Sequence, residues 1–124
     1  MKFRYASHTN HLKPIIEFYT TLYDFEVLGE FKDHQGYDGV FIGLPNENWH
    51  LEFTVSWEQP LHRPDEDDLL VFYPKNMNDY ELIINKMSLL NMKPSRPKNP
   101  YWRRYGTLVI DPDGFGVVFV KPEK

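Results

Sequence analysis

The 124-residue chain contains no cysteine, which excludes disulfide bonds, thiolate zinc sites and cysteine nucleophiles. It lacks an apolar run near the roughly 18 residues of a membrane-spanning helix, and no signal-peptide pattern follows the first methionine. It also lacks a basic excess, because 14 lysines and arginines face 18 acidic residues, which disfavours phosphate-backbone binding. We therefore expect a soluble cytoplasmic protein that binds neither membranes nor nucleic acid.

Aromatic residues make up 16% of the chain, enough to fill the single core that one domain of this length can build. The first half is interpreted as strand–helix–strands: its first clear signal is a helical pattern, followed by strand-like runs at 25–31, 37–44 and 49–57 that turn-forming segments separate. The apolar face of this predicted helix consists of Ile15, Ile16, Tyr19, Leu22 and Tyr23. Pro14 fits its first turn, and Asp24 is a residue that can end it in the left-handed conformation.

The same order of elements begins again after a proline-rich, acidic linker. A strand at 69–73 precedes a helix predicted to start at Asn78 and end at Asn91, with Glu81 three residues into a capping-box-like pattern. The remaining predicted elements are an edge strand or extended loop at 94–97 and strands at 107–110 and 115–120. This repeat indicates an α+β fold of two βαβββ modules, about 1–58 and 66–124, with the linker at about 59–65.

Two groups of motifs resemble one known family. The first is His11–Tyr19 followed by Phe25–Leu28; the second is Asn99-Pro100-Tyr101-Trp102, then Gly106 and the hairpin turn Asp111-Pro112-Asp113-Gly114. Together they are similar to the vicinal oxygen chelate superfamily of glyoxalases, bleomycin-resistance proteins and dioxygenases, although a histidine stands where an acid usually opens the first helix. The resemblance implies a single domain over 1–124, in which the two modules curl mixed sheets into a cup, and a homodimer.

The resemblance also implies where a metal would bind, since many members hold Fe, Mn, Zn or Ni near the first and fourth strands of each module. Those four positions fall on Arg4, Glu52, one of the residues 68–70, and Val118. A guanidinium stays protonated and a valine has no donor atom, so Glu52 is the one clear ligand among them. Of Asp68, Leu69 and Leu70, only the aspartate could ligate. We therefore expect no cofactor, and an Arg4–Glu52 ion pair in place of the metal.

A metal site remains an alternative interpretation. If the first strand were shifted in register, His8, His50 and Glu52 could converge on a divalent ion, as in a glyoxalase-type lyase, a thiol transferase or a dioxygenase. Glu52 is also the candidate catalytic base of an enzyme that needs no metal.

We predict binding rather than catalysis: sequestration or sensing of a small organic ligand in an aromatic cup, as in bleomycin-resistance proteins. The candidate ligand-binding residues are Arg4, His50, Glu52, Tyr101, Trp102, Arg103 and Arg104. The competing interpretations are a purely structural ion pair, aromatic core packing and solvated arginines. A further alternative is an interaction module whose cup is filled by its own side chains.

Overall fold

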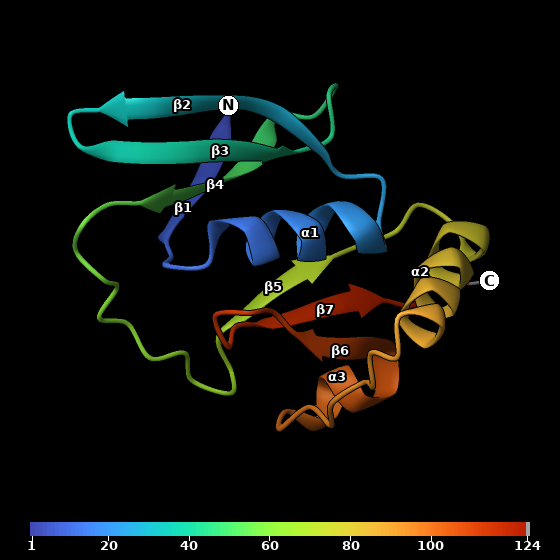
Figure 1. Cartoon of the computed structure of the whole chain (residues 1–124). Coiled ribbons are helices and arrows are strands. Elements are labelled where there is room, and N and C mark those ends of the chain that lie inside the picture. Colours follow the sequence, from blue (N-terminus) through green and yellow to red (C-terminus); the bar gives the residue numbers. More distant parts are fainter. Residues whose placement is uncertain (124) are drawn as a thin grey trace. The chain divides into compact units, whose positions relative to one another are not determined.

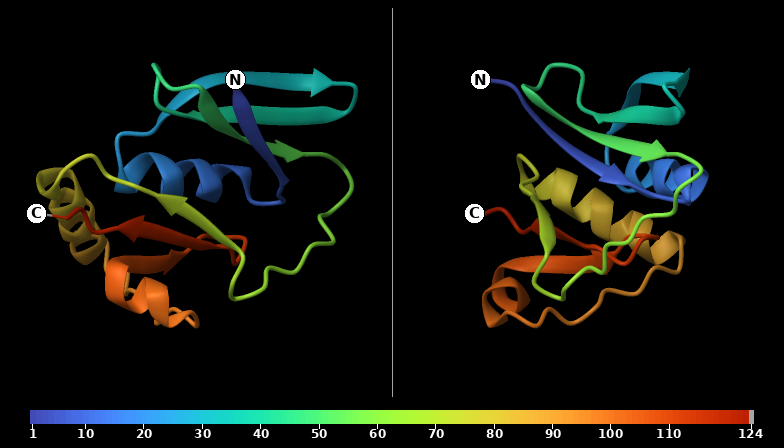
Figure 2. Two further views of the ribbon diagram at one scale, coloured as in Figure 1. Left: turned by 180° about the vertical axis from the view of Figure 1, so that it is seen from behind. Right: turned by 90° about the vertical axis from the view of Figure 1, so that its left-hand side faces the viewer.

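The computed structural model describes residues 1–123 and divides into two units after His62. Each unit is a mixed sheet with at least one helix, and in both units one strand and then the helical part precede the remaining strands (Figures 1 and 2). This arrangement confirms the α+β fold of paired βαβββ modules. No helix within residues 1–123 has both the length and the apolar character that crossing a membrane requires.

The first unit contains one helix and a four-stranded sheet in the order β1-β4-β3-β2. Strands β1 and β4 are parallel, whereas β2–β3 and β3–β4 are antiparallel. Its elements are β1 (Phe3–His8), α1 (Leu12–Leu22), β2 (Glu26–His34), β3 (Tyr37–Gly43) and β4 (Trp49–Val55).

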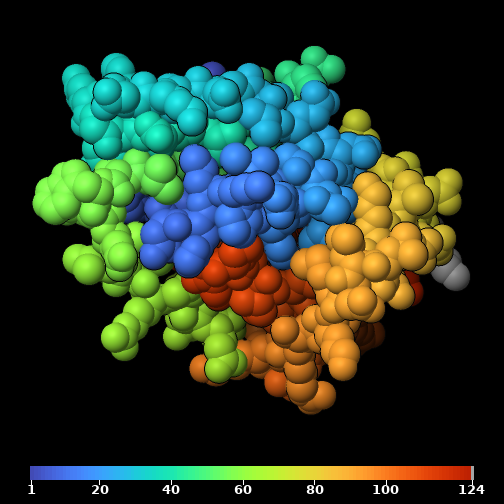
Figure 3. Space-filling view, in the orientation of Figure 1, coloured from blue at the N-terminus to red at the C-terminus, as the bar shows by residue number. Residues whose placement is uncertain are grey.

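Helix α1 covers one face of this sheet. Its buried side chains are Ile15, Tyr19 and Leu22, as the 3.6-residue period predicted, and the Tyr19 ring stacks on Phe53 of β4 at 5.1 Å between centroids. The outer side of α1 lies on the molecular surface (Figure 3). The expected left-handed ending at Asp24 is wrong: the helix ends at Tyr23 in extended backbone, because the chain turns directly into β2.

The second unit builds a three-stranded sheet in the order β5-β7-β6, with β5 and β7 parallel. These strands correspond to β1, β4 and β3 of the first unit. The elements are β5 (Leu69–Phe72), α2 (Met77–Leu89), α3 (Pro100–Tyr105), β6 (Gly106–Ile110) and β7 (Gly116–Val120).

Three details of the second unit differ from the sequence prediction. Helix α2 starts after Asn76 rather than at Asn78, because the Asn76 side chain accepts the backbone N–H of Asp79 at 2.9 Å. The counterpart of β2 is reduced to one bridge, between Ser95 and Leu108. Helix α3 was not predicted at all. The expected end of α2 is confirmed, since Asn91 adopts φ 55°.

The predicted hairpin turn between β6 and β7 is confirmed in detail. The Asp111 carboxylate accepts the backbone N–H groups of Asp113 and Phe115, and Gly114 N donates to the Asp111 carbonyl at 2.9 Å. Gly114 has φ 92°, a conformation that side chains with a Cβ rarely adopt. The turn therefore needs both its aspartate and its glycine.

Candidate functional site

The candidate site lies on the face of the first sheet opposite α1, which we call the Arg4 face. Side chains alternate along each strand, so residues that are paired across neighbouring strands share this face. Its rows, read across the sheet, are Arg4 with His50; Ala6 with Glu52, Phe41 and Gly29; and His8 with Thr54, Gly39 and Phe31. The alternate residues of β4, Leu51 and Phe53, are buried on the α1 side.

A polar cluster occupies one end of the Arg4 face. The Arg4 guanidinium donates from Nε to His50 Nε2 at 2.8 Å and lies 3.7 Å from Glu52 Oε1. Its Cζ is 4.8 Å from the centre of the Phe41 ring, whose edge-to-face contact with His50 spans 5.4 Å. The predicted Arg4–Glu52 ion pair is therefore present. Its arginine side chain is 44% exposed and its glutamate 14% exposed, so the pair is only partly withdrawn from water.

The surroundings of His50 favour its neutral form. Burial lowers the pKa of its imidazole below the ordinary value, and the charges of Arg4 and Lys2 lower it further, whereas Glu52 acts in the opposite direction. Because Arg4 donates to Nε2, this nitrogen must carry a lone pair, which leaves Nδ1 with the proton. The hydrogen bond and the lowered pKa thus favour the same protonation state.

Acid should destabilise the first unit through His50. The unfolded chain protonates this imidazole at its ordinary pKa, 6.5, whereas the folded chain resists protonation, so the free energy of unfolding falls as the pH drops below that value. The variant His50→Gln keeps an acceptor for Arg4 but does not titrate, so its stability should depend less on pH. Urea unfolding between neutral and mildly acidic pH measures both slopes.

The control for this experiment is His11→Gln, which removes an exposed histidine at the start of α1. Equal pH slopes in the wild type and His50→Gln would show that His50 does not contribute to the acid sensitivity.

His8 lies at the other end of the Arg4 face. It is opposite Thr54, four residues beyond the level of His50, which corresponds to about 13 Å along the strands. Its Nδ1 is 2.8 Å from Thr54 Oγ1 and its Nε2 is 2.9 Å from the Glu58 carbonyl oxygen. The register therefore does not bring His8 to His50 and Glu52, and the alternative metal set is not assembled.

The second unit carries apolar residues at the equivalent positions. Glu52 lies two residues beyond the partner of Arg4; in the same way Val118 lies two residues beyond Gly116, the partner of Leu69. The register thus identifies Leu69, rather than Asp68 or Leu70, as the counterpart of Arg4. Within residues 1–123, no three histidine, aspartate or glutamate side chains are grouped closely enough to hold a metal ion.

The other predicted binding residues lie on α3, in the second unit. Tyr101 is exposed and contacts the rings of Trp102 and Tyr105 at 4.8 and 4.7 Å between centroids. Arg103 donates to the carbonyl oxygens of Pro97 and Lys98, so its guanidinium connects α3 to the segment just before this helix. Arg104, by contrast, stacks over Tyr105 at 5.3 Å. These two arginines, adjacent in sequence, therefore have different surroundings.

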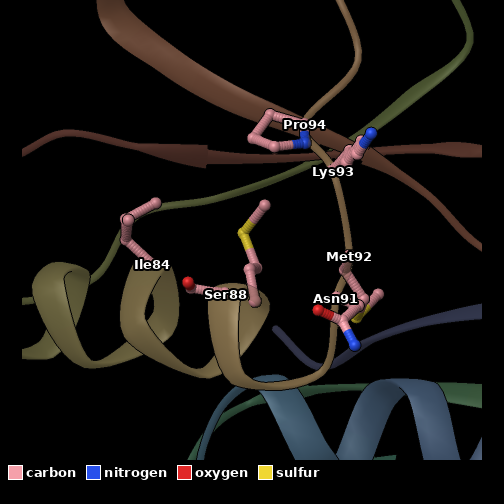
Figure 4. Close-up of a pocket in the computed structure, with 7 residues that line it drawn as sticks. Ile84, Ser88, Asn91, Met92, Lys93 and Pro94 are labelled. Atoms are coloured by element: carbon pink, nitrogen blue, oxygen red, sulfur yellow. The ribbon is translucent and has the colours of Figure 1, made fainter.

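A hollow of about 350 Å³ lies beside the C-terminal part of α2 and the segment that follows this helix (Figure 4). Ile84, Met87, Met92 and Pro94 give it a mostly apolar lining, to which Ser88, Asn91 and Lys93 add polar atoms. None of these lining residues is acidic or a histidine. This hollow therefore lacks the carboxylate and imidazole groups that the Arg4 face contains, and we do not regard it as the candidate site.

Phe31 and Phe41 are site residues that the sequence analysis missed. The Phe31 ring lies over Gly39 and is 5.8 Å from the Phe41 ring, which makes an aromatic surface beside Glu52. Strand alternation could have placed Phe41 opposite Glu52 if the β3–β4 register had been known. Phe31 could not have been placed, because two irregularities shift the β2–β3 register.

Comparison with known protein families identifies both units. Residues 3–54 match the model of the YycE-like N-terminal domain, and residues 67–121 match that of the YycE-like C-terminal domain. The chain belongs to the YycE-like family. The boundaries of the two YycE-like domains lie on either side of the division after His62.

The YycE-like chain is similar to YycE of Bacillus subtilis, an uncharacterized protein, with 39% identity over 94% of this chain and 85% of that protein. The crystal structure of Bacillus subtilis YycE, a protein of unknown function, superposes with a TM-score of 0.84 at 38% identity. It covers 99% of this chain and 90% of the other.

More distant structures share the fold. Glyoxalase I of Leishmania major has a TM-score of 0.71 at 20% identity, over 95% of this chain and 84% of its own. The fosfomycin resistance protein FosX of Mesorhizobium loti has a TM-score of 0.70 at 9% identity, over 97% and 90% of the two chains. The YycE-like chain therefore has the fold of glyoxalases and fosfomycin resistance proteins, as the resemblance to the vicinal oxygen chelate superfamily implied.

Proposed function

We propose that this protein binds a small organic ligand on the Arg4 face without a divalent metal, and so acts in sequestration or sensing. The observation that carries this proposal is the position of the Arg4 guanidinium, which contacts His50, Glu52 and Phe41 together. At a position where the family resemblance implied a metal ligand, the chain thus has a polar cluster beside the aromatic surface of Phe31 and Phe41. Mostly apolar surfaces with a few fixed polar groups are typical of small-molecule sites.

The residues of the Arg4 face do not fit a divalent metal ion. Arg4 carries a permanent positive charge, which repels a cation, and its Nε–H occupies the His50 Nε2 lone pair. The same guanidinium compensates the Glu52 carboxylate at 3.7 Å. A metal would have to displace Arg4 to reach His50 Nε2, and at Glu52 it would be repelled by the neighbouring guanidinium. Leu69 and Val118, the equivalent pair in the second unit, have no donor atoms at all.

Phe31 and Phe41 support a ligand with a flat or apolar body. Both rings are partly exposed, and neither belongs to the core between the sheet and α1. Tyr101, Trp102 and Arg104 lie on α3 of the second unit, and their role in ligand binding stays a prediction.

Two measurements test the proposal together. Protein purified without chelator should contain a metal stoichiometry near zero, and incubation with Mn, Fe, Zn or Ni should leave its melting temperature unchanged. A screen of small aromatic compounds should find some that raise the melting temperature, because a ligand selective for the folded state stabilises it. Phe41→Ala should abolish that rise, whereas Tyr73→Ala, which removes an exposed tyrosine of the second unit, should not.

A stoichiometric metal that stabilises the protein would overturn the metal-free site and favour the lyase or dioxygenase alternative. The absence of stabilisation by every compound, at concentrations up to their solubility, would instead favour an interaction module.

A further inference from the structure

The far end of the Arg4 face contains a hollow of about 330 Å³. It lies where β1 and β4 end, two rows beyond the Arg4–His50 pair. The side chains that matter for its chemistry are His8, Tyr37, Thr54, Ser56, Glu58 and Gln59. All of them belong to the first unit, so the hollow is complete without the second.

The hydrogen bonds of His8 determine which atoms remain for a ligand. A carbonyl oxygen can only accept, so Nε2 donates its proton to Glu58, 2.9 Å away. In the neutral ring Nδ1 then accepts the hydroxyl proton of Thr54 at 2.8 Å. The Thr54 oxygen is left with lone pairs and no free proton. It can therefore accept a hydrogen bond from a ligand but cannot donate one.

Ser56 is committed in a similar way. Its hydroxyl oxygen accepts the backbone N–H of Glu58 at 3.2 Å and lies 3.2 Å from His8 Nε2, whose proton it shares as an acceptor with the Glu58 carbonyl. The Ser56 hydroxyl donates to that same carbonyl oxygen, 3.3 Å away. The Ser56 proton is thus used within the chain.

Charge and aromatic surface at this end favour a cation. Glu58 is the one residue among those lining the hollow that carries a formal charge at neutral pH, and no lysine or arginine is among them. The Tyr37 ring is 47% exposed and meets His8 edge-on at 5.8 Å between centroids. An aromatic face and a carboxylate with neighbouring acceptors are the groups that bind an ammonium. Arg4, the strong cation of β1, is four residues from His8, about 13 Å by strand geometry, but only two residues from Ala6, which also lines the hollow. Its guanidinium is engaged by His50 and Glu52.

We propose that this hollow binds the protonated amine of a ligand whose apolar or aromatic body lies over Phe31 and Phe41. Thr54 accepts a hydrogen bond from the ammonium, Glu58 compensates its charge, and Tyr37 contacts it through its ring. The inference rests on the proposed ligand-binding function of the Arg4 face and specifies the chemical class of that ligand.

Three compounds with one scaffold test the proposal: 2-phenylethylamine, 2-phenylethanol and phenylacetate, titrated calorimetrically into the full chain at neutral pH. The amine is expected to bind at least about tenfold more tightly than the alcohol, a difference of about 1.4 kcal/mol, and phenylacetate more weakly still. High salt should reduce the advantage of the amine, because a partly exposed charge pair is screened.

Two variants locate the contact. Glu58→Gln should remove most of the advantage of the amine over the alcohol and leave alcohol binding unchanged. Thr54→Val should also lower the affinity for the amine relative to the wild type. The matched control is Glu47→Gln, which makes the same charge change in the turn before β4 and should leave the ratio unchanged. Urea unfolding of each variant confirms that it folds.

Equal affinities for the amine and the alcohol would overturn the inference, as would an unchanged ratio in Glu58→Gln. If none of the three binds while other compounds stabilise the protein in a Phe41-dependent way, the inference fails and the proposed function stands. If no compound of any kind binds, both fail.

Discussion

Replacing Phe53 with alanine is expected to lower the free energy of unfolding of the first unit by about 3–5 kcal/mol, the usual cost of removing a core phenylalanine. The Phe53 side chain is only 2% exposed and stacks on Tyr19, so its removal opens a cavity between β4 and α1. Since whole domains are stable by only about 5–15 kcal/mol, this loss is a large fraction of the total stability. Urea titration followed by circular dichroism measures the loss.

Phe41→Ala is the matched control, because Phe41 lies on the opposite face of the same sheet and is only partly buried. It should cost clearly less stability than Phe53→Ala while abolishing ligand binding. If both variants cost the same, the assignment of the two faces to core and site is wrong.

Gly39→Ala is expected to destabilise the protein by about 1–3 kcal/mol, as overpacking usually does, and to displace an aromatic ring from the site. A Cβ added at Gly39 would lie 2.3 Å from Cζ of Phe31, a distance that real contacts do not reach. The ring must therefore swing away, which removes part of the aromatic surface beside Phe41. Unfolding measurements and calorimetry with a stabilising compound report the two effects separately.

The double variant Gly39→Ala with Phe31→Leu identifies the cause. If the clash with the ring produces the loss, the two substitutions together should cost less than the sum of the separate costs. Strict additivity would show that the alanine acts through the backbone of β3 instead.

The order of elements could be predicted because it depends on local patterns. The spacing of Ile15, Tyr19 and Leu22 identified the buried side of α1, and the turn at 111–114 carries its own aspartate and glycine chemistry. Helix α3 escaped prediction because it is only six residues long, too short for a period to show, although Asn99 and Pro100 are typical of a helix start. The isolated bridge at Ser95 is likewise too short for an alternating strand pattern to appear in the sequence.

The identities of several residues of the candidate site could be predicted from the sequence. His50 and Glu52 are two residues apart on one strand and so share a face, and the family resemblance assigned Arg4 and Glu52 to equivalent positions, which led to the predicted ion pair that the structure contains. What could not be predicted is register. The β1–β4 pairing set His8 opposite Thr54 instead of His50, and the β5–β7 pairing made Leu69 the counterpart of Arg4.

By itself, the sequence determined the repeated βαβββ order, the side of α1 that is buried and the chemical types available near Glu52, because these follow from spacing and side-chain identity. The tertiary structure alone decided that Arg4 Nε donates to His50, that the Phe31 ring lies over Gly39 and that His8 borders a separate hollow. Each of these contacts joins residues whose separation in space depends on strand register and bulges, which no local pattern in the sequence specifies.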